Sequence, residues 1–296
     1  MKITKLAAID VGSNAMRLLV NTIYDDGQNV TFNKTSLVRA PIRLGEDAFS
    51  DNKISEENLQ RMQKAMKAFR LLMDVHGVQD YRAYATSAMR ELKNSKAILK
   101  KIQKNTDVNL EIIDGEKEGN IIFETELKEY VNDEKTYLYV DVGGGSTECT
   151  LLAHGKVLVT QSFKVGTVRW LEGIVGEDYM NQEVKPWIYE NCRGLDEIEL
   201  IGSGGNINHI FKQSQAKPGK PLSYVYLNKQ RNILKSLSFE DRLRIYNMKQ
   251  DRADVVVPAL EIYCGIMKFA QSRRIHVPKI GLADGMIQWM YHHNQY

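Results

Sequence analysis

One pattern of apolar and polar residues occurs twice in this chain. Residues 6–20 read LAAIDVGSNAMRLLV, and residues 138–153 read LYVDVGGGSTECTLLA. In each, a short apolar run ends in Asp-Val-Gly, passes through small polar residues and becomes apolar again. The pattern predicts a strand, a tight turn and a second strand, with a carboxylate at the mouth of each turn, Asp10 or Asp141. One such turn would be typical of an ordinary hairpin, and the repetition favours two related sites.

The rest of the first half alternates strands with helices. A long helix is expected between Ser55 and Gly77, where apolar residues recur at helical spacing. Residues 42–47 read as a polar turn. The expected strands are 5–11, 16–24, 28–38, 80–85 and 110–113, and further helices are expected after 85–91, from Asn94-Ser95 through Lys104, and from 114–119 to near Val131.

The second half repeats this scheme. A mostly helical stretch is expected over 168–192, broken by Gly176 and Pro186, and a surface loop over 214–224. The expected strands are 136–142, 148–153, 156–163 and 198–201, and later helices are expected around 228–248, 255–271 and 281–291. Because strands precede helices in both halves, the order predicts two α/β domains of related fold, with a boundary near 125–135.

Composition narrows the class of protein. The chain has 296 residues, 43% of them hydrophobic and 26% charged, as in ordinary globular proteins. A net charge of +3 is too small to indicate nucleic-acid binding by itself. Three cysteines without a CxxC pair argue against a thiolate metal site and favour a reducing, cytoplasmic location. Asp10 interrupts the first apolar run, so a strand and not a signal peptide is expected, and no run approaches the ~18 apolar residues of a membrane span.

The two turns have the chemistry of phosphate sites. Glycine lets a backbone approach a ligand closely, and a row of turn amides can cradle phosphate oxygens. The second turn is the stronger candidate because it contains three successive glycines, Gly143, Gly144 and Gly145, before Ser146 and Thr147. Gly204-Gly205 follows a strand and precedes a helix, which predicts a further anion site. The chain contains neither a dinucleotide fingerprint nor a GxxxxGK[ST] phosphate loop.

Carboxylates and arginines lie close to the same turns. Asp10 and Asp141 fit the role of Mg²⁺ ligands, because Mg²⁺ is usually held by one or two carboxylates together with substrate phosphates. Glu118 and Glu148 fit the role of a base that orients or deprotonates water. Positive charge for phosphate oxygens is expected from Arg90, with Arg17 and Arg43 as further candidates.

A basic helix follows Asn94. Its lysines, Lys96, Lys100, Lys101 and Lys104, are typical of a solvated helix face. A surface that guides a long polyanion is the alternative, and the sequence alone does not choose between them.

Taken in order along the chain, these motifs resemble the exopolyphosphatase/guanosine pentaphosphatase (Ppx/GppA) family. AAIDVGSNAMRLLV and VDVGGGSTE resemble its first and second phosphate motifs. The segments that resemble its other signatures are IRLGE, ATSAMRELKN, IIDGEKEG, FKVGTVR, IGSGGNI and RADVVVPALEI. The resemblance implies two ribonuclease H-like domains of the actin, sugar-kinase and chaperone superfamily, with mixed sheets and a cleft between them. The domains are expected at 1–127 and 128–281, with a helix at about 282–296 packed on the first.

The resemblance also implies roles for single residues. Glu118 matches the family's catalytic glutamate, which activates water, and Glu148 its second glutamate, which is also a metal-ligand candidate beside Asp10 and Asp141. Arg90 matches its phosphate-contacting arginine. The remaining phosphate-binding positions are Gly12, Ser13, Asn14, Gly143, Gly144, Gly145, Ser146 and Thr147, and a nucleotide or second phosphate site is expected at Gly204, Gly205 and Asn206.

Several positions depart from the family pattern. Lys117 replaces a glutamate beside Glu118, Asn206 replaces a threonine, and LADG at 282–285 stands where LREG is usual, so an arginine and a glutamate are missing near the second-domain site. The helical extension of longer members is absent from this sequence, which favours short polyphosphates or nucleotides as substrates.

The expected function is hydrolysis of the terminal phosphoanhydride of polyphosphate, or of the 5′ γ-phosphate of guanosine pentaphosphate. Water would attack in line, assisted by Mg²⁺, with Mn²⁺ as a substitute metal and K⁺ as a candidate activator. Expected partners are these ligands or guanosine tetraphosphate and a second copy of the chain, without membrane or specific nucleic acid. Two alternatives stay open: a phosphotransferase with an adenosine site at GSGGN, and a non-catalytic alarmone or polyphosphate sensor in which Lys117 weakens Glu118.

Overall fold

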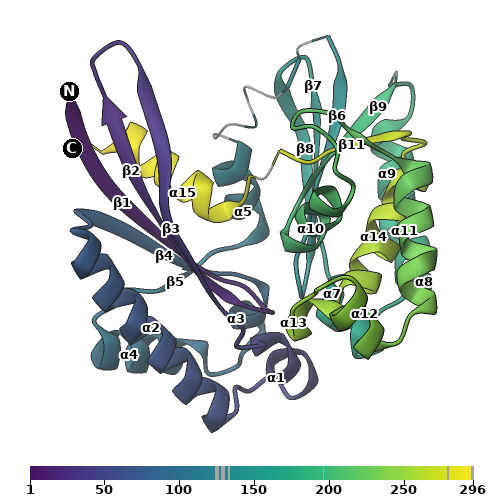
Figure 1. The fold of residues 1–296 in the computed structure, drawn as a ribbon. Coiled ribbons are helices and arrows are strands. Elements are labelled where there is room, and N and C mark those ends of the chain that lie inside the picture. The colour runs from purple at the N-terminus through teal and green to yellow at the C-terminus, as the bar shows by residue number, and fades with distance from the viewer. Residues whose placement is uncertain (124–126, 128–130, 133, 196, 279, 295–296) are drawn as a thin grey trace. The chain divides into compact units, whose positions relative to one another are not determined.

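A computed structural model describes residues 1–123, 127, 131–132, 134–195, 197–278 and 280–294 (Figure 1). The chain forms two compact units. Unit 1 consists of Met1–Thr125 with Gly281–Tyr296, and unit 2 of Glu126–Ile280. The chain therefore leaves unit 1, builds unit 2 and returns. The helix expected to reach Val131 ends, in its described α-helical part, at Ile122, and most of its remaining residues lie outside the described ones.

Unit 1 is built on a mixed five-stranded sheet in the order β3-β2-β1-β4-β5. The first three strands are antiparallel neighbours, and β4 and β5 continue the sheet in parallel with β1. All ten residues of β2, and eight of the ten residues of β1, are at least partly buried, which explains their near-continuous apolar sequence. The strands are β1 (Lys2–Val11), β2 (Met16–Asp25), β3 (Val30–Ala40), β4 (Asp80–Ala85) and β5 (Glu111–Ile112).

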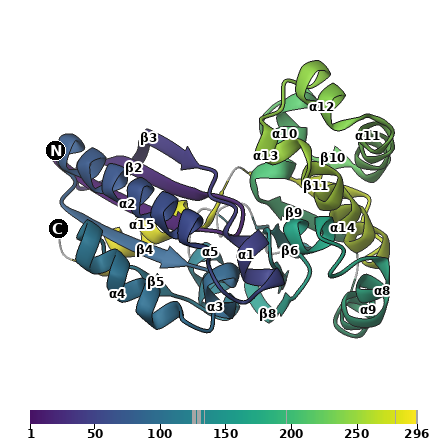
Figure 2. The same cartoon turned by 90° about the horizontal axis from the view of Figure 1, so that it is seen from below.

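Helices cover both faces of this sheet (Figures 1 and 2). α2 (Glu56–His76) and α4 (Ser95–Thr106) pack together on one face, and α5 (Gly115–Ile122) and α15 (Leu282–His293) on the other. α2 begins where Ser55 accepts a hydrogen bond from the Asn58 amide and ends at Gly77 in the left-handed region, as the pattern predicts. The two shorter helices are α1 (Leu44–Ser50) and α3 (Ser87–Glu91).

The prediction of a polar turn at 42–47 is wrong, because α1 begins there. Arg43 adopts φ 62°, and the amides of Arg43 and Gly45 donate hydrogen bonds to the carbonyls of Asn14 and Ser13. Contacts from the first glycine turn thus set the start of α1, and such long-range contacts leave no periodic signal in so short a segment.

α15 joins unit 1 although it lies at the other end of the sequence. Tyr291 donates a hydrogen bond of 2.6 Å to Asp25 at the end of β2, and its ring packs edge-on against Phe32. Asp284 forms an ion pair of 2.6 Å with Lys34 on β3. The segment 282–285 therefore belongs to unit 1, although it was considered above in connection with the site of the second domain.

Unit 2 repeats the topology of unit 1 with one added edge strand. Its sheet order is β10-β11-β9-β6-β7-β8, in which β6, β7 and β8 are antiparallel neighbours and β9 and β11 run parallel to β6. The predicted pair of related mixed-sheet α/β domains is confirmed. The strands are β6 (Thr136–Val142), β7 (Thr147–Ala153), β8 (Lys156–Phe163), β9 (Ile198–Ser203), β10 (Leu222–Ser223) and β11 (Arg274–His276).

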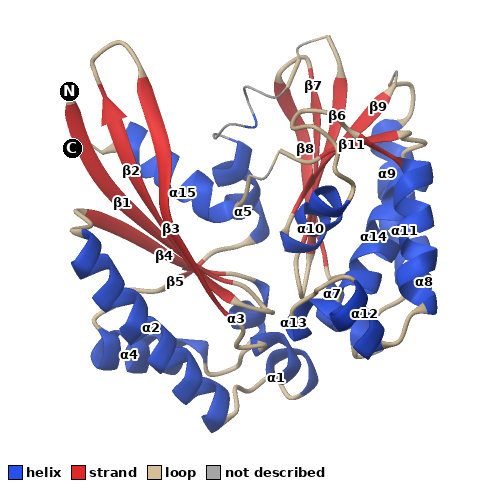
Figure 3. Ribbon diagram, viewed as in Figure 1, coloured by secondary structure: helices blue, strands red, loops and turns tan. Residues whose placement is uncertain are grey.

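The helices of unit 2 pack around α14 (Val256–Phe269), nine of whose residues are buried (Figure 3). Pro186 does not break a helix as predicted but stands at the start of α9 (Lys185–Cys192), directly after a π-helical turn. The loop expected at 214–224 contains the short β10. The other elements are α7 (Thr167–Leu171), α8 (Glu177–Tyr179), a π-helical turn (Met180–Val184), α10 (Gly205–Gln213), α11 (Tyr224–Ser236), α12 (Phe239–Ile245) and α13 (Gln250–Ala253).

In the part of the chain that the structure describes, no helix combines the length and the apolar character needed to cross a membrane.

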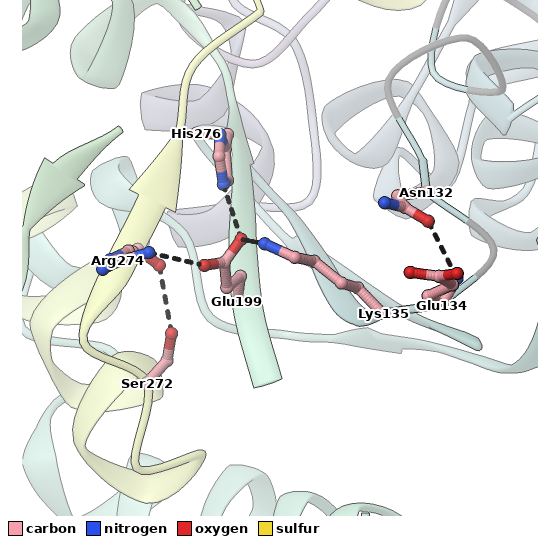
Figure 4. Close-up of polar contacts among 7 residues, drawn as sticks. All are labelled: Asn132, Glu134, Lys135, Glu199, Ser272, Arg274 and His276. Carbon is pink, nitrogen blue, oxygen red and sulfur yellow. Dashed lines mark hydrogen bonds and ion pairs between the residues drawn. The ribbon is translucent and has the colours of Figure 1, made fainter. Parts of the chain in front are cut away.

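A cluster of charges joins the amino ends of the parallel strands in unit 2 (Figure 4). Glu199 on β9 is buried, and its carboxylate lies 3.3 Å from Lys135 Nζ, 3.4 Å from Arg274 Nη1 and 2.9 Å from His276 Nε2. Ligands of open α/β sheets bind outside the opposite, carboxyl ends of the strands. We therefore assign this cluster to holding β9 and β11 and the start of β6 together.

The cluster predicts a stability that depends on pH. Burial raises the pKa of Glu199, but the hydrogen bonds and charges of His276 and Lys135 outweigh it and hold the pKa below its usual value of 4.5. A carboxylate with a depressed pKa stabilises the fold above its unfolded pKa, and this contribution is lost as the pH falls through the folded pKa. Glu199→Gln is expected to lower the free energy of unfolding by about 2 kcal/mol at neutral pH.

Urea denaturation of the protein, followed by a spectroscopic signal from unit 2, would measure this change in the free energy of unfolding. The difference between wild type and Glu199→Gln is expected to shrink well below pH 4.5, where Glu199 also becomes neutral. The matched control is Glu197→Gln, which removes an exposed carboxylate of the same segment and should shift the free energy by less than about 0.5 kcal/mol. An equal loss at neutral and acid pH would contradict an electrostatic role for Glu199.

Candidate active site

The first glycine turn joins β1 to β2 in unit 1. The Gly12 amide donates to the Ala15 carbonyl at 3.1 Å and closes the turn. Its remaining carbonyls are held from outside the hairpin: Ser13 accepts from the Gly45 amide at 2.8 Å and Asn14 from the Arg43 amide at 3.0 Å. The IRLGE segment is therefore the support of this turn, a role that its polarity alone did not indicate.

The second turn joins β6 to β7 in unit 2 and is closed in the same way. The Gly143 amide donates to the Ser146 carbonyl at 3.0 Å. All three glycine carbonyls are then occupied: Gly143 accepts from the Thr167 amide at 3.0 Å and Gly144 from the Val168 amide at 2.8 Å. Gly145 accepts from the Arg169 Nε at 2.7 Å. These donors all come from α7, which braces the turn from one side.

This bracing decides where the turn amides point. In a trans peptide the C=O of one residue and the N–H of the next point in opposite directions, and no described peptide bond is cis. Because the carbonyls of residues 143–145 point toward α7, the amides of residues 144–146 point away from it. The same argument orients the amides of Asn14 and Ala15 in unit 1. Each turn thus presents successive N–H groups on one side, which is the geometry of an anion cradle.

Gly166 allows α7 to come this close. A Cβ atom at Gly166 would lie 2.5 Å from the carbonyl carbon and oxygen of Gly144 and 2.6 Å from the Gly145 nitrogen, which no real side chain tolerates. The guanidinium of Arg169 completes the brace, although Arg169 is itself buried. In the sequence, the segment FKVGTVR was noted only because it resembles a signature of the family. Neither Gly166 nor Arg169 follows a periodic pattern that would have indicated its role.

The two turns occupy the same register in their sheets but carry different charges. Asp10 pairs across the strands with Arg17, seven residues later, and Asp141 pairs across with Glu148, also seven residues later. In unit 1 the pair is a salt bridge, with Arg17 Nη1 3.2 Å from Asp10 Oδ2. Burial raises the pKa of Asp10, and Arg17 opposes that shift. In unit 2 two carboxylates face each other, an arrangement that favours a bound cation.

Hydroxyl groups hold the second carboxylate. Ser146 and Ser162 both donate to Glu148 Oε1, at 2.7 and 2.9 Å, and Glu148 is buried. Thr147 was expected to bind phosphate, but its fully buried hydroxyl donates to the Val165 carbonyl at 2.6 Å. The hydroxyl of Thr147 therefore anchors the turn to the connection between β8 and α7.

The GSGGN turn lies against Asp141 and not at a separate place in unit 2. Ser203 pairs with Asp141 across parallel strands, and its hydroxyl lies 3.4 Å from Asp141 Oδ2. Gly204 adopts φ 114°, which favours glycine, and a Cβ there would lie 3.3 Å from Asp141 Oδ1. Gly205 and Asn206 begin α10 directly beyond it. The structure thus brings Asp141, Gly204 and the start of α10 together, as a helix N-terminus beside a carboxylate.

Glu118 lies in a buried position on α5. Asp114 caps this helix by accepting the Lys117 amide, which sets Glu118 in its first turn. Arg90 Nη1 lies 3.5 Å from Glu118 Oε2 and donates to the Ile113 carbonyl at 2.7 Å. Arg90 belongs to α3, the helix that also carries Ser87.

α3 connects this pair to the first turn. The hydroxyls of Ser87 and Ser13 are 2.9 Å apart in the protein interior, so the turn contacts α3 one helical turn before Arg90. Unit 1 therefore brings Ser13, Arg90 and Glu118 to one end of its sheet through a single short helix.

Lys117 points away from Glu118. Its ammonium lies 3.9 Å from Glu111 Oε2 and 4.8 Å above the centre of the Tyr84 ring. Arg90, on another helix, pairs with Glu118. The expected weakening of Glu118 by Lys117, which motivated the sensor alternative, finds no support in this geometry.

The carboxylates suit a metal that a substrate carries. In the described residues no three His, Cys, Asp or Glu side chains gather into a metal cluster. Mg²⁺ keeps several waters and needs only one or two protein carboxylates beside phosphate oxygens, so a complete protein cage is not required. The hard oxygen donors of Asp10, Asp141 and Glu148 fit this ion.

With this geometry in hand, comparison with known proteins is informative. The model of the Ppx/GppA phosphatase family matches residues 25–294. The chain belongs to the Ppx/GppA phosphatase family. It is 26% identical to a crystallised exopolyphosphatase from Cytophaga hutchinsonii, with a TM-score of 0.85 over 97% of each chain.

Two curated relatives of this Ppx/GppA chain are longer proteins. A bifunctional 3-dehydroquinate synthase/phosphatase from Fusobacterium nucleatum is 31% identical over 67% of this chain and 32% of its own length. A guanosine-5′-triphosphate,3′-diphosphate pyrophosphatase from Photobacterium profundum is 25% identical over 96% of this chain and 59% of its own length. The chain thus spans about one third to three fifths of the length of these relatives.

The brace predicts a strong effect at Gly166 in this Ppx/GppA protein. Gly166→Ala is expected to lower the free energy of unfolding by about 2 kcal/mol, because the new Cβ overlaps the backbone of the second turn. Gly176→Ala is the matched control: Gly176 also precedes a helix with an extended backbone, and a Cβ there meets nothing within 4 Å. Thermal denaturation of both variants tests this, and equal melting temperatures would contradict it.

Proposed function

We propose that this chain is a phosphoanhydride hydrolase. Its substrate is inorganic polyphosphate, from which it removes the terminal phosphate, or guanosine pentaphosphate, from which it removes the 5′ γ-phosphate. The first substrate is suggested by the exopolyphosphatase name of the crystallised relative, and the second by the name of the Photobacterium relative.

One observation carries the proposal: the buried Glu118 beside Arg90 on elements that contact the first amide cradle. A base that activates water must be held in place and within reach of the phosphate. The cap at Asp114 fixes the helix of Glu118, and the Arg90 ion pair fixes its carboxylate. Arg90 also supplies positive charge beside Glu118, and it would contact the oxygens of the phosphate on which Glu118 acts.

The mechanism follows from these positions. The amides of Asn14 and Ala15 in unit 1, or those of residues 144–146 in unit 2, would donate hydrogen bonds to phosphate oxygens, which withdraws charge from the leaving group. Glu118 would accept a proton from the attacking water. Arg90 would stabilise the charge that develops on the transferred phosphoryl group. A Mg²⁺ ion held by Asp10, Asp141 or Glu148 would supply neutralisation of the remaining phosphate charge.

Removal of the proposed base tests the reaction. Glu118→Gln keeps the size and hydrogen-bonding capacity of the side chain but cannot accept the proton, so phosphate release should fall about 10²- to 10⁴-fold. Glu116→Gln is the matched control, because Glu116 is an exposed glutamate of the same helix turn. Phosphate release from tripolyphosphate, long-chain polyphosphate and guanosine pentaphosphate gives both the activity and the preferred substrate.

The outcomes separate hydrolase from sensor. A loss in Glu118→Gln alone, with ligand affinity retained, supports the hydrolase. If the wild type binds a ligand tightly but releases no phosphate from any of the three, hydrolysis is contradicted and the chain acts as a binding protein.

Removal of divalent metal tests the role of the carboxylates. EDTA is expected to reduce phosphate release to background, and added Mg²⁺ to restore it, because a Mg²⁺ ion held by Asp141 and Glu148 would neutralise charge on the substrate phosphates. Asp141→Asn should require more Mg²⁺ for half-maximal rate. Full activity in EDTA would overturn the metal assignment without affecting the role of Glu118.

A further inference from the structure

α4 carries an uncompensated stripe of positive charge. The helix spans Ser95–Thr106, and its sequence SKAILKKIQKNT contains four lysines and no acidic residue. Ile98, Ile102 and Thr106 are buried, and the four lysines are all exposed on the remaining surface. Within the described ranges, none of these ammonium groups forms an ion pair with a carboxylate.

The lysines of this stripe destabilise α4. Lys96, Lys100 and Lys104 follow one another at spacings of four residues, so their side chains lie along one face and repel each other. Lys96 also stands in the first turn, where the helix dipole disfavours a cation, and Asn94 makes no side-chain cap. Packing of the apolar face against α2 must offset these costs. A polyanion laid along the face would remove the repulsion.

The stripe begins close to the candidate active site. Lys96 follows Arg90 by six residues, and α3 and α4 are in contact. From there α4 extends away from α3 (Figure 2). At 1.5 Å per residue, Lys96 and Lys104 are separated by roughly 12 Å along the helix. The positive face is thus a linear row of cations that begins at the end of α4 nearer to α3, the helix of Arg90, and leads away from it.

We propose that the lysine face of α4, formed by Lys96, Lys100, Lys101 and Lys104, binds the distal part of a linear polyphosphate whose end is held at the active site. This rests on the proposed function, because that function makes a polyphosphate the ligand. A linear chain with a charge on every phosphate matches several cations in a row. A guanosine polyphosphate has too few phosphates to reach from Arg90 along the whole stripe.

The proposal predicts that affinity depends on chain length through α4. The test variant is Lys96→Gln with Lys100→Gln and Lys104→Gln, since glutamine and lysine have similar helix propensity. The matched control replaces three exposed lysines of unit 2, Lys156, Lys229 and Lys268, by glutamine and so removes the same charge. A third variant with arginine at 96, 100 and 104 keeps the charge.

Binding is measured first in EDTA, with long-chain polyphosphate and with tripolyphosphate as probes, over a range of salt concentrations. For the long chain, loss of three contacts should weaken binding roughly tenfold. The slope of log K against log salt concentration should also fall by about 2. Tripolyphosphate affinity should not change. The control triple and the arginine variant should behave as wild type for both probes.

Turnover with Mg²⁺ then provides the second measurement. The α4 glutamine variant should show a raised KM for the long chain, and an unchanged KM and kcat for tripolyphosphate. An equal loss of affinity for long-chain polyphosphate and tripolyphosphate would overturn the proposal, since the lysines would then act only through long-range electrostatic attraction and not through contacts with the distal phosphates. An unchanged salt slope, or binding of phosphatidylserine vesicles but not of polyphosphate through these lysines, would overturn it too.

The two proposals can fail separately. If the wild type releases no phosphate but binds long chains with a lysine-dependent salt slope, hydrolysis is wrong and the α4 track is supported. If phosphate release depends on Glu118 while the α4 variant matches wild type, the active site is supported and the track is wrong.

Discussion

The candidate site depends on hydrogen bonds accepted by the carbonyl groups of its glycine turns, on the side opposite to the amides that would bind a ligand. A flexible run such as Gly143-Gly144-Gly145 has no fixed shape of its own, because glycine has few steric limits. Hydrogen bonds from α7 to all three carbonyls remove that freedom and, through the planarity of the peptide, aim the amides in one direction. Preorganised donors of this kind need no rearrangement when charge develops on a ligand. Residues that never touch a ligand therefore determine the cradle.

In unit 1 the carbonyl groups of the first glycine turn are held by a different helix. There the amides of residues 43 and 45, at the start of α1, hold the carbonyls of the first turn, and Ser13 is fixed by Ser87. The charges differ as well. Asp10 is already paired with Arg17, whereas Asp141 faces Glu148. One fold used twice has thus produced a turn with an acid–base pair across its strands and a turn with two acids in the same positions.

The sequence predicted long elements well and short ones poorly. α2 was predictable because its cap, its periodic apolar face and its terminal glycine all indicate one helix. α1 was missed because Arg43 and Gly45 are set by the first turn, and the place of Pro186 depends on the π-helical turn before it. At the site, the acids, glycines and Arg90 were named from sequence. The buried roles of Thr147, Arg169 and Gly166 were not, since each depends on a partner well separated along the chain.

By itself, the sequence determined the duplicated Asp-Val-Gly hairpin, two α/β domains and the residue types that phosphate and Mg²⁺ require, because these follow from local pattern and composition. Only the tertiary structure decided what each residue contacts. It paired Glu118 with Arg90 and turned Lys117 toward Glu111. It also placed Gly204 against Asp141 and left the lysines of α4 without counter-ions in the described residues. The physical reason is that charge and hydrogen bonding act between neighbours in space, and a sequence orders neighbours only along the chain.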